Sequence, residues 1–211
     1  MEIVFYEKHN EYFKKNEITG FYGDVLDLYK LDIAIDGITY DDKWTVKRFL
    51  KGKIVSNKSR IDSIFKYLEL NPEIIKLKLE DLSKTDFKFV LLAKTLLLNK
   101  NIIVFDYFDV GLTYKDQKRL IRIIRTLKKD GKTIVIISKD LVFLSQIVES
   151  IIVYKDGEII YNGNINELTK LGKIADENIT KFIKLANNKN AKLDYTLDSK
   201  ELLKDIYRSV Y

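Results

Sequence analysis

The middle of the chain alternates between continuously apolar runs and a helical pattern, and this alternation limits the folds that it can adopt. Residues 102–105 (IIVF) and 132–138 (KTIVIIS) are the apolar runs. Between them, residues 113–131 form an amphipathic pattern whose apolar side contains Leu120, Ile123, Ile124 and Leu127. Strands that read as unbroken apolar runs are typical of parallel strands buried on both faces. The sequence therefore predicts an α/β protein with a parallel core sheet.

The flanking segments have their own periodicities. Short β patterns fill residues 1–40, with runs at EIVFYEK, EITGFYGD and, around Gly37, LDIAIDGITY. Further helices are predicted over 61–70, over 83–99 with Ser83 as the N-cap, and over 140–150. The segment SIIVYKDGEIIYNG predicts a hairpin that turns at Asp156-Gly157, and the rest is helical with a polar break at NNKNAK.

Composition excludes several kinds of site. The 211 residues include no cysteine and one histidine, His9, so disulfides, thiolate metal sites and histidine clusters are not expected. The net charge of +6 comes from 37 basic and 31 acidic residues, and the lysines do not alternate with aromatic residues in one stripe. A nucleic-acid partner is therefore not expected. The N-terminus does not resemble a signal peptide, and no apolar run is long enough to span a bilayer.

The stretch NIIVFDYFDVGL ends a buried strand in an unusual way. Asp106 stands at the mouth of the strand, and two aromatic residues, Tyr107 and Phe108, follow it. The carboxylate suits either a metal ligand or a cap for nearby backbone N–H groups. The two rings suit either packing or a platform for a ligand.

The order of motifs from 79 to 163 resembles the ATP-binding subunit of ABC transporters. LEDLSKTDFKFVLLAKTLLLNKNIIVFDYFDVGL, followed by KRLIRIIRTLKKDGKTIVIISKDLVFLSQIVESIIVYKDGEIIYNG, matches the family's signature helix, Walker B strand, D-loop, switch strand and closing hairpin. The final LDSKELLKDIYRSVY resembles the last helix of the drug- and peptide-exporting members.

This resemblance implies a P-loop NTPase-like ABC nucleotide-binding fold with an N-terminal antiparallel β subdomain and a reduced helical subdomain. It predicts an ABC ATPase-like domain over 1–163 and a C-terminal helical extension over 164–211. Within the first domain, 1–40 would be the β subdomain, 41–98 the reduced helical region, and 99–163 half of the core sheet.

The resemblance also assigns vestigial ligand positions. Asp106 matches the Mg²⁺-binding aspartate, Gly20 and Gly23 match the phosphate cradle, Ser83 belongs to the signature motif, and Lys139 replaces the switch histidine.

The parts that carry out hydrolysis in the family are missing from the matched positions. No Gly-Lys-Ser/Thr follows Gly23, Tyr107 replaces the water-activating glutamate, and LSKTD at 82–86 replaces LSGGQ. A phenol with a pKa near 10 is a poor general base at neutral pH. Because phosphoryl transfer depends on positioned charge, these losses predict a chain without catalytic residues.

Three functions remain open at this point. The first is a non-hydrolysing pseudo-ATPase that acts as a structural or regulatory partner of a membrane transporter complex or of an active sister ATPase. The second is a divergent but active ABC ATPase, and the third is an ABC-fold protein-binding module unrelated to transport.

The first function implies protein partners, namely a sister ATPase or a transmembrane permease subunit. It implies no cofactor, whereas the second requires ATP and Mg²⁺. We expect a cytoplasmic chain at the inner face of the cell membrane, touching the membrane only through a partner. Trp44 suits either the core or a coupling surface.

Overall fold

A computed structural model describes residues 2–6, 11–23, 38, 40–51, 58–155, 158–170, 177–196 and 199–210. The strands are β1 (Glu2–Tyr6), β2 (Glu11–Lys14), β3 (Ile18–Tyr22), β4 (Ile102–Asp106), β5 (Thr133–Ser138), β6 (Ser150–Lys155) and β7 (Glu158–Asn164). The α-helices are α1 (Val46–Lys51), α2 (Lys58–Tyr67), α3 (Lys84–Leu97), α4 (Tyr114–Lys129), α5 (Leu141–Ser145), α6 (Ile165–Lys170), α7 (Glu177–Asn188) and α8 (Ser199–Val210). Two 3₁₀ helices, η2 (Pro72–Lys76) and η3 (Leu79–Asp81), connect α2 to α3.

The core is a five-stranded sheet in the order β4-β5-β3-β6-β7. The first four strands are parallel, and β7 pairs antiparallel with β6. Strands β1 and β2 form a separate antiparallel pair. The predicted parallel core sheet is therefore confirmed, with one antiparallel strand at its edge.

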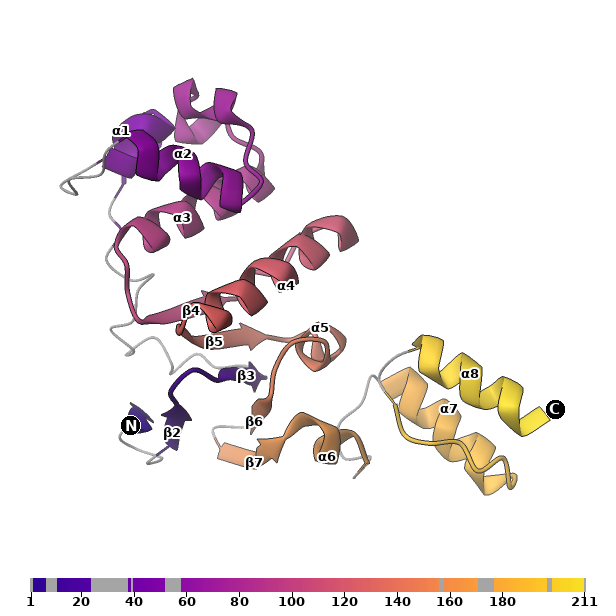
Figure 1. The fold of residues 1–211 in the computed structure, drawn as a ribbon. Helices are drawn as coiled ribbons and strands as arrows, with labels where there is room; N and C mark the ends of the chain where they lie inside the picture. Colours follow the sequence, from indigo (N-terminus) through magenta and orange to yellow (C-terminus); the bar gives the residue numbers. More distant parts are fainter. Residues whose placement is uncertain are drawn as a thin grey trace.

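Strand β3 lies in the centre of this sheet, between β5 and β6 (Figure 1). The sequence analysis assigned residues 1–40 to an N-terminal β subdomain. In the structure, β3 belongs to the core sheet instead. The physical reason is its burial, because residues 18–21 are buried and pair with strands on both sides. A strand buried in this way needs neighbours at both edges to satisfy its backbone.

The two faces of the sheet carry different apolar clusters. One face packs with α3, α4 and α5 in the main core, which extends to Phe49 of α1 and Phe65 of α2. Figure 1 shows α1, α2 and α3 gathered on the same side of the sheet as α4. The opposite face carries a smaller buried cluster made of Phe21, Val104, Val135, Ile137 and Ile152.

Several predicted boundaries need adjustment. The helix expected over 83–99 is α3, with Ser83 as its N-cap, so that prediction is confirmed. The helix expected over 140–150 is only α5, because the chain turns at 146–149 to enter β6. Most of the pattern around Gly37 and the turn at Asp156-Gly157 lie outside the described residues.

Helices α7 and α8 share a small apolar core of their own, built on Ile183, Leu193 and Leu202. The polar break between them falls where the sequence indicates it, since α7 ends at Asn188. Within the described ranges, no helix is long and apolar enough to cross a membrane.

Candidate functional site

The carboxyl ends of the parallel strands bring the predicted ligand residues to one edge of the sheet. Gly23 follows β3, Tyr107 follows β4, and Lys139 follows β5. In open α/β sheets, ligands bind at this edge, next to the point where neighbouring strands connect in opposite directions. The structure therefore gathers Gly23, Asp106 and Lys139 at the edge where a nucleotide site is expected.

Asp106 is the last residue of β4 and is half-buried, and it pairs in register with Ile137 of β5. Among the described residues, no three His, Cys, Asp or Glu side chains gather closely enough to form a metal site. Mg²⁺ is commonly held by one or two carboxylates together with substrate phosphates. Asp106 is therefore suited to be one ligand of several for a magnesium ion.

Tyr107 crosses this edge of the sheet. Its hydroxyl donates a hydrogen bond of 3.0 Å to the carbonyl oxygen of Gly23. Strand β5 lies between β4 and β3, so the phenol joins the ends of two strands that are about 10 Å apart. The ring packs against the smaller apolar cluster on the second face of the sheet.

The backbone of Tyr107 has a φ of 44°, in the left-handed region that non-glycine residues seldom adopt. Its N–H donates a hydrogen bond of 2.9 Å to the carbonyl oxygen of Ile137, which anchors the residue to the end of β5. Left-handed residues cluster at functional sites, where the surrounding contacts hold them in place. Here the backbone bond to Ile137 and the side-chain bond to Gly23 are two such contacts.

Gly20 and Gly23 have different reasons to lack a side chain. Gly20 lies inside β3, where a Cβ would come within 2.9 Å of Val148 Cγ1. Gly23 has a φ of 127°, and a Cβ there would come within 2.0 Å of the carbonyl oxygen of Tyr154. Close packing therefore explains Gly20, whereas Gly23 is required by the backbone turn at the carboxyl edge.

Lys88 of α3 holds the loop that follows β4, a contact that the sequence analysis did not predict. Its ammonium group donates to the carbonyl oxygens of Phe108 at 2.9 Å and Val110 at 2.6 Å, and to that of Tyr107 at 3.4 Å. Partial burial lowers the pKa of Lys88 from its usual value, while the nearby Asp109 carboxylate opposes this shift. A lysine on a helix surface gives no sequence signal that it will meet a loop about 20 residues away.

Two further side chains fix the same loop. Phe108 is buried and packs edge-to-face with Phe89 of α3 and Phe105 of β4. Asp109 is also buried, and Ser138 donates a hydrogen bond of 2.8 Å to its Oδ2. Burial raises the pKa of the Asp109 carboxyl, and among the described residues no donor bonds to its Oδ1 atom. For Phe108, the structure favours the packing interpretation over the ligand platform.

Ser83 caps α3 together with Asp86. The Ser83 hydroxyl accepts a hydrogen bond from the Asp86 N–H at 3.0 Å and donates one to the Asp86 carboxylate at 2.7 Å. Helix N-termini attract anions through their free N–H groups and the helix dipole. At this N-terminus, a side-chain carboxylate already occupies that environment.

The two other predicted residues lie near the surface. Lys139 is exposed beyond the end of β5. Trp44 is half-buried against the main core, and the Arg48 guanidinium lies 4.7 Å from the centre of its ring. Trp44 therefore has a face in the core and a face on the surface.

The chain is similar to curated ATP-binding proteins of import systems over part of its length. It is 36% identical over 89 residues to the ribose import ATP-binding protein RbsA of Caldanaerobacter subterraneus, which is 42% of this chain and 18% of that protein. It is 30% identical over 132 residues to the galactose/methyl galactoside import ATP-binding protein MglA of Clostridium perfringens, which is 61% of this chain and 25% of that protein. The chain thus spans about a fifth to a quarter of the length of these relatives.

A third relative is the energy-coupling factor transporter ATP-binding protein of Leuconostoc mesenteroides, 36% identical over 88 residues, or 42% of this chain and 31% of that protein. No family model matches the chain. The two sugar-import relatives are named for import, so they do not support the drug- and peptide-exporting subtype that the C-terminal helix suggested.

Solved structures share the fold over most of the chain. The protein cbiO1 of Clostridium perfringens, part of the ABC transporter complex cbiONQ, superposes with a TM-score of 0.64 at 17% identity, over 86% of this chain and 90% of that one. The ATP-binding cassette MJ0796, bound to ADP and Pi, superposes with a TM-score of 0.61 at 18% identity, over 74% of this chain and 89% of that one. The chain therefore has the α/β fold of an ABC transporter ATP-binding domain.

Proposed function

We propose that this chain is a degenerate ABC-type nucleotide-binding subunit that does not hydrolyse ATP. In this proposal it serves as a structural or regulatory partner, in contact with a transporter's membrane subunit or with an active sister ATPase. The observation that carries the proposal is the hydrogen bond from Tyr107 to Gly23 across the carboxyl edge of the sheet.

The position of Tyr107 supports the loss of catalysis in two ways. A hydrolytic site needs a base to orient and activate the attacking water, and a phenol, with an ordinary pKa near 10, is a poor general base at neutral pH. The side chain also lies between the end of β4, where Asp106 stands, and the end of β3, where the phosphate cradle would begin. A phosphate bridging those two points would compete with the ring for the same space.

The N-terminal cap of α3 also supports the loss of catalysis. In an ABC dimer, this end of the helix would face the nucleotide of the partner subunit. Asp86 places a negative charge in the first turn of α3, bonded to Ser83. A phosphate arriving there would meet a like charge, at a cost that the helix dipole only partly offsets. The lack of glycine at Lys84 and Thr85 also keeps the backbone from a close approach.

An active, divergent ATPase is the second candidate, because the relatives carry ATP-binding names and Asp106 is retained. The binding of Mg²⁺ through Asp106 would then require a cradle outside the described residues. The two candidates differ in whether the chain hydrolyses ATP, so the test measures ATP hydrolysis.

The test is ATP hydrolysis by the purified chain, with and without Mg²⁺, beside the Asp106→Asn variant. The proposal expects no phosphate release above that of Asp106→Asn. Restoring a carboxylate with Tyr107→Glu should also give no turnover, because the phosphate cradle and signature glycines are missing as well. Turnover that depends on Mg²⁺ and is lost in Asp106→Asn would establish the second candidate.

The partner half of the proposal is tested separately. Affinity purification of the tagged chain from its native host should recover a second ABC ATPase or a polytopic membrane protein in stoichiometric amount. Recovery of the chain alone, or with partners of neither kind, would count against a role in a transporter complex.

A further inference from the structure

The positive charge of this chain is concentrated in one segment. Of its 37 basic and 31 acidic residues, 7 basic and 2 acidic residues lie within 40–60, and the remaining 30 and 29 nearly cancel. Most of the net charge of +6 therefore comes from about a tenth of the sequence. The segment includes α1 and the start of α2, which Figure 1 shows on the side of α3 that faces away from the core sheet.

Every exposed residue of α1 is basic. The helix buries its three apolar residues in the main core, and its other three residues, Lys47, Arg48 and Lys51, are exposed. Lys47 and Lys51 are neighbours on the helix surface, because they are four positions apart. Lys43, in the turn before the helix, is exposed as well. These four residues are called the α1 basic face below.

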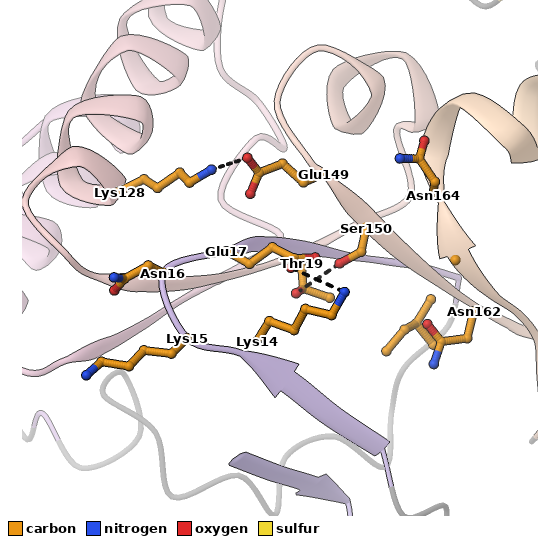
Figure 2. A pocket seen from close by; sticks show the side chains of 12 residues that line it. Lys14, Lys15, Asn16, Glu17, Thr19, Lys128, Glu149, Ser150, Asn162 and Asn164 are labelled. Atoms are coloured by element: carbon orange, nitrogen blue, oxygen red, sulfur yellow. Dashed lines mark hydrogen bonds and ion pairs between the residues drawn. The ribbon is translucent and has the colours of Figure 1, made fainter. Parts of the chain in front are cut away.

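The charge of the α1 basic face is not neutralised by acidic neighbours. At the amino edge of the sheet, by contrast, Lys128 pairs with Glu149, and the Lys14 ammonium lies 3.9 Å from the Glu17 carboxylate (Figure 2). In the part of the chain that the structure describes, no ion pair joins the α1 basic face to a carboxylate. This face therefore suits an anionic partner.

Aromatic and apolar side chains border the α1 basic face. Trp44 is half-buried, and the Arg48 guanidinium lies 4.7 Å from the centre of its ring. Tyr40 is 43% exposed and packs edge-to-face against Phe49 of α1. Leu77 is 42% exposed, and its carbonyl oxygen accepts the first N–H of α1. Tryptophan and tyrosine are enriched where proteins meet the headgroup layer of a membrane.

We propose that the α1 basic face docks on the anionic headgroups of a membrane surface. Each basic side chain close to an anionic leaflet strengthens binding roughly fivefold. The bordering Tyr40, Trp44 and Leu77 then lie at the level of the headgroups, where amphipathic rings are most stable. This contact is direct, whereas the sequence analysis expected the chain to touch the membrane only through a partner.

The aromatic residues favour a lipid surface over a nucleic acid. Proteins that bind single-stranded nucleic acid stack its bases on exposed aromatic rings. Trp44 packs against the main core and lies beneath Arg48. The Tyr40 ring meets Phe49 and Phe87 edge-to-face, with ring centres 5.9 and 5.5 Å apart. Because both rings already contact other side chains, they are poor platforms for stacking bases.

The test is co-sedimentation of the whole chain with vesicles of phosphatidylcholine that contain about 30% phosphatidylserine, and with phosphatidylcholine vesicles alone. At about 0.1 M salt the anionic vesicles should bind the chain at least tenfold more tightly, and about 1 M salt should abolish the difference. The double variant Lys47→Gln/Lys51→Gln should weaken binding at least tenfold. The matched control, Lys115→Gln/Lys129→Gln, removes two exposed lysines from α4 and should change binding less than threefold.

Trp44 reports whether this particular face meets the lipid, because it is the only tryptophan of the chain. Its fluorescence should move to shorter wavelength on anionic vesicles and should be quenched by lipids that carry a spin label at the headgroup. If the double variant does not fold, Lys43→Gln in the turn before α1 should still weaken binding roughly fivefold. The assay needs neither ATP nor a partner protein, so its outcome is independent of the proposed loss of hydrolysis.

Four results would overturn the proposal. The first is equal binding to the two kinds of vesicle, and the second is binding that the Lys47→Gln/Lys51→Gln and Lys43→Gln variants leave unchanged. The third is vesicle binding with no change in Trp44 fluorescence. The fourth is displacement from the vesicles by micromolar single-stranded oligonucleotide or polyglutamate, since that would assign the face to a nucleic acid or to an acidic protein segment.

Discussion

Replacing Tyr107 by alanine and by glycine should reverse the usual order of stability for these two residues. In ordinary helix or strand positions, glycine is less stable than alanine by about 0.5–1 kcal/mol, because the unfolded chain has more freedom to lose. At Tyr107 the backbone φ is 44°, which costs an L-residue roughly 1–2 kcal/mol and costs glycine little. The glycine variant should therefore be more stable than the alanine variant by roughly 1 kcal/mol.

A third variant, Tyr107→Phe, isolates the hydroxyl. It keeps the ring in its packing place and removes only the 3.0 Å hydrogen bond to the Gly23 carbonyl. The loss should be about 0.5–1.5 kcal/mol, the usual net value of one such bond. For a chain of this size, each kcal/mol lowers the melting temperature by about 2–4 °C.

The assay is urea unfolding followed by circular dichroism for the four proteins, with free energies from linear extrapolation. Lys184 in the exposed middle of α7 provides the matched control, because there alanine should exceed glycine by about 1 kcal/mol. Alanine at 107 as stable as glycine would refute the left-handed backbone. A phenylalanine variant with wild-type stability would show that the contact to Gly23 contributes nothing.

Three more substitutions test other contacts. Burial raises the pKa of Asp109 in the folded protein, so the folded state binds this proton more tightly than the unfolded chain does. The free energy of unfolding is therefore highest, as far as Asp109 is concerned, below pH ~4, and it falls as the pH rises through the raised pKa. Asp109→Asn should therefore raise the melting temperature at pH 7 relative to wild type, and a series of melts should show that gain vanishing below pH ~4. Lys88→Met removes the hydrogen bonds to the loop carbonyls and should cost about 1.5–3 kcal/mol in urea unfolding, whereas a loss below ~0.5 kcal/mol would mean that the loop does not depend on Lys88. Gly20→Ala forces a Cβ to within 2.9 Å of Val148 and should cost about 1–3 kcal/mol, and unchanged stability would remove the packing explanation for this glycine.

The sequence predicts the strands of the core well, because burial on both faces leaves unbroken apolar runs such as 102–105 and 134–137. It also places Ser83 correctly as a helix cap, since the cap depends on residues only three positions apart. It does not reveal that β3 lies at the centre of the sheet. Strand order depends on which edges meet in space, and apolar periodicity carries no information about that.

For the candidate site too, part of the arrangement could be predicted from the sequence and part could not. Parallel strands have a common carboxyl edge, so the approach of Asp106, Lys139 and Gly23 could be expected once the strands were known. The bridge from Tyr107 to Gly23 joins residues 84 positions apart and depends on a positive φ that tyrosine rarely adopts. The Lys88 contacts likewise depend on how α3 packs over the loop, which no local pattern encodes.

Binding of ATP with Mg²⁺ to the purified chain, measured by calorimetry and by thermal unfolding, tests the central claim most directly. A ligand present at a hundred times its Kd stabilises the folded state by about 2.7 kcal/mol, a rise of several degrees for a chain of this size. The account predicts no binding heat and no change in melting temperature at millimolar ATP. Saturable binding that requires Mg²⁺ and is lost in Asp106→Asn would contradict it.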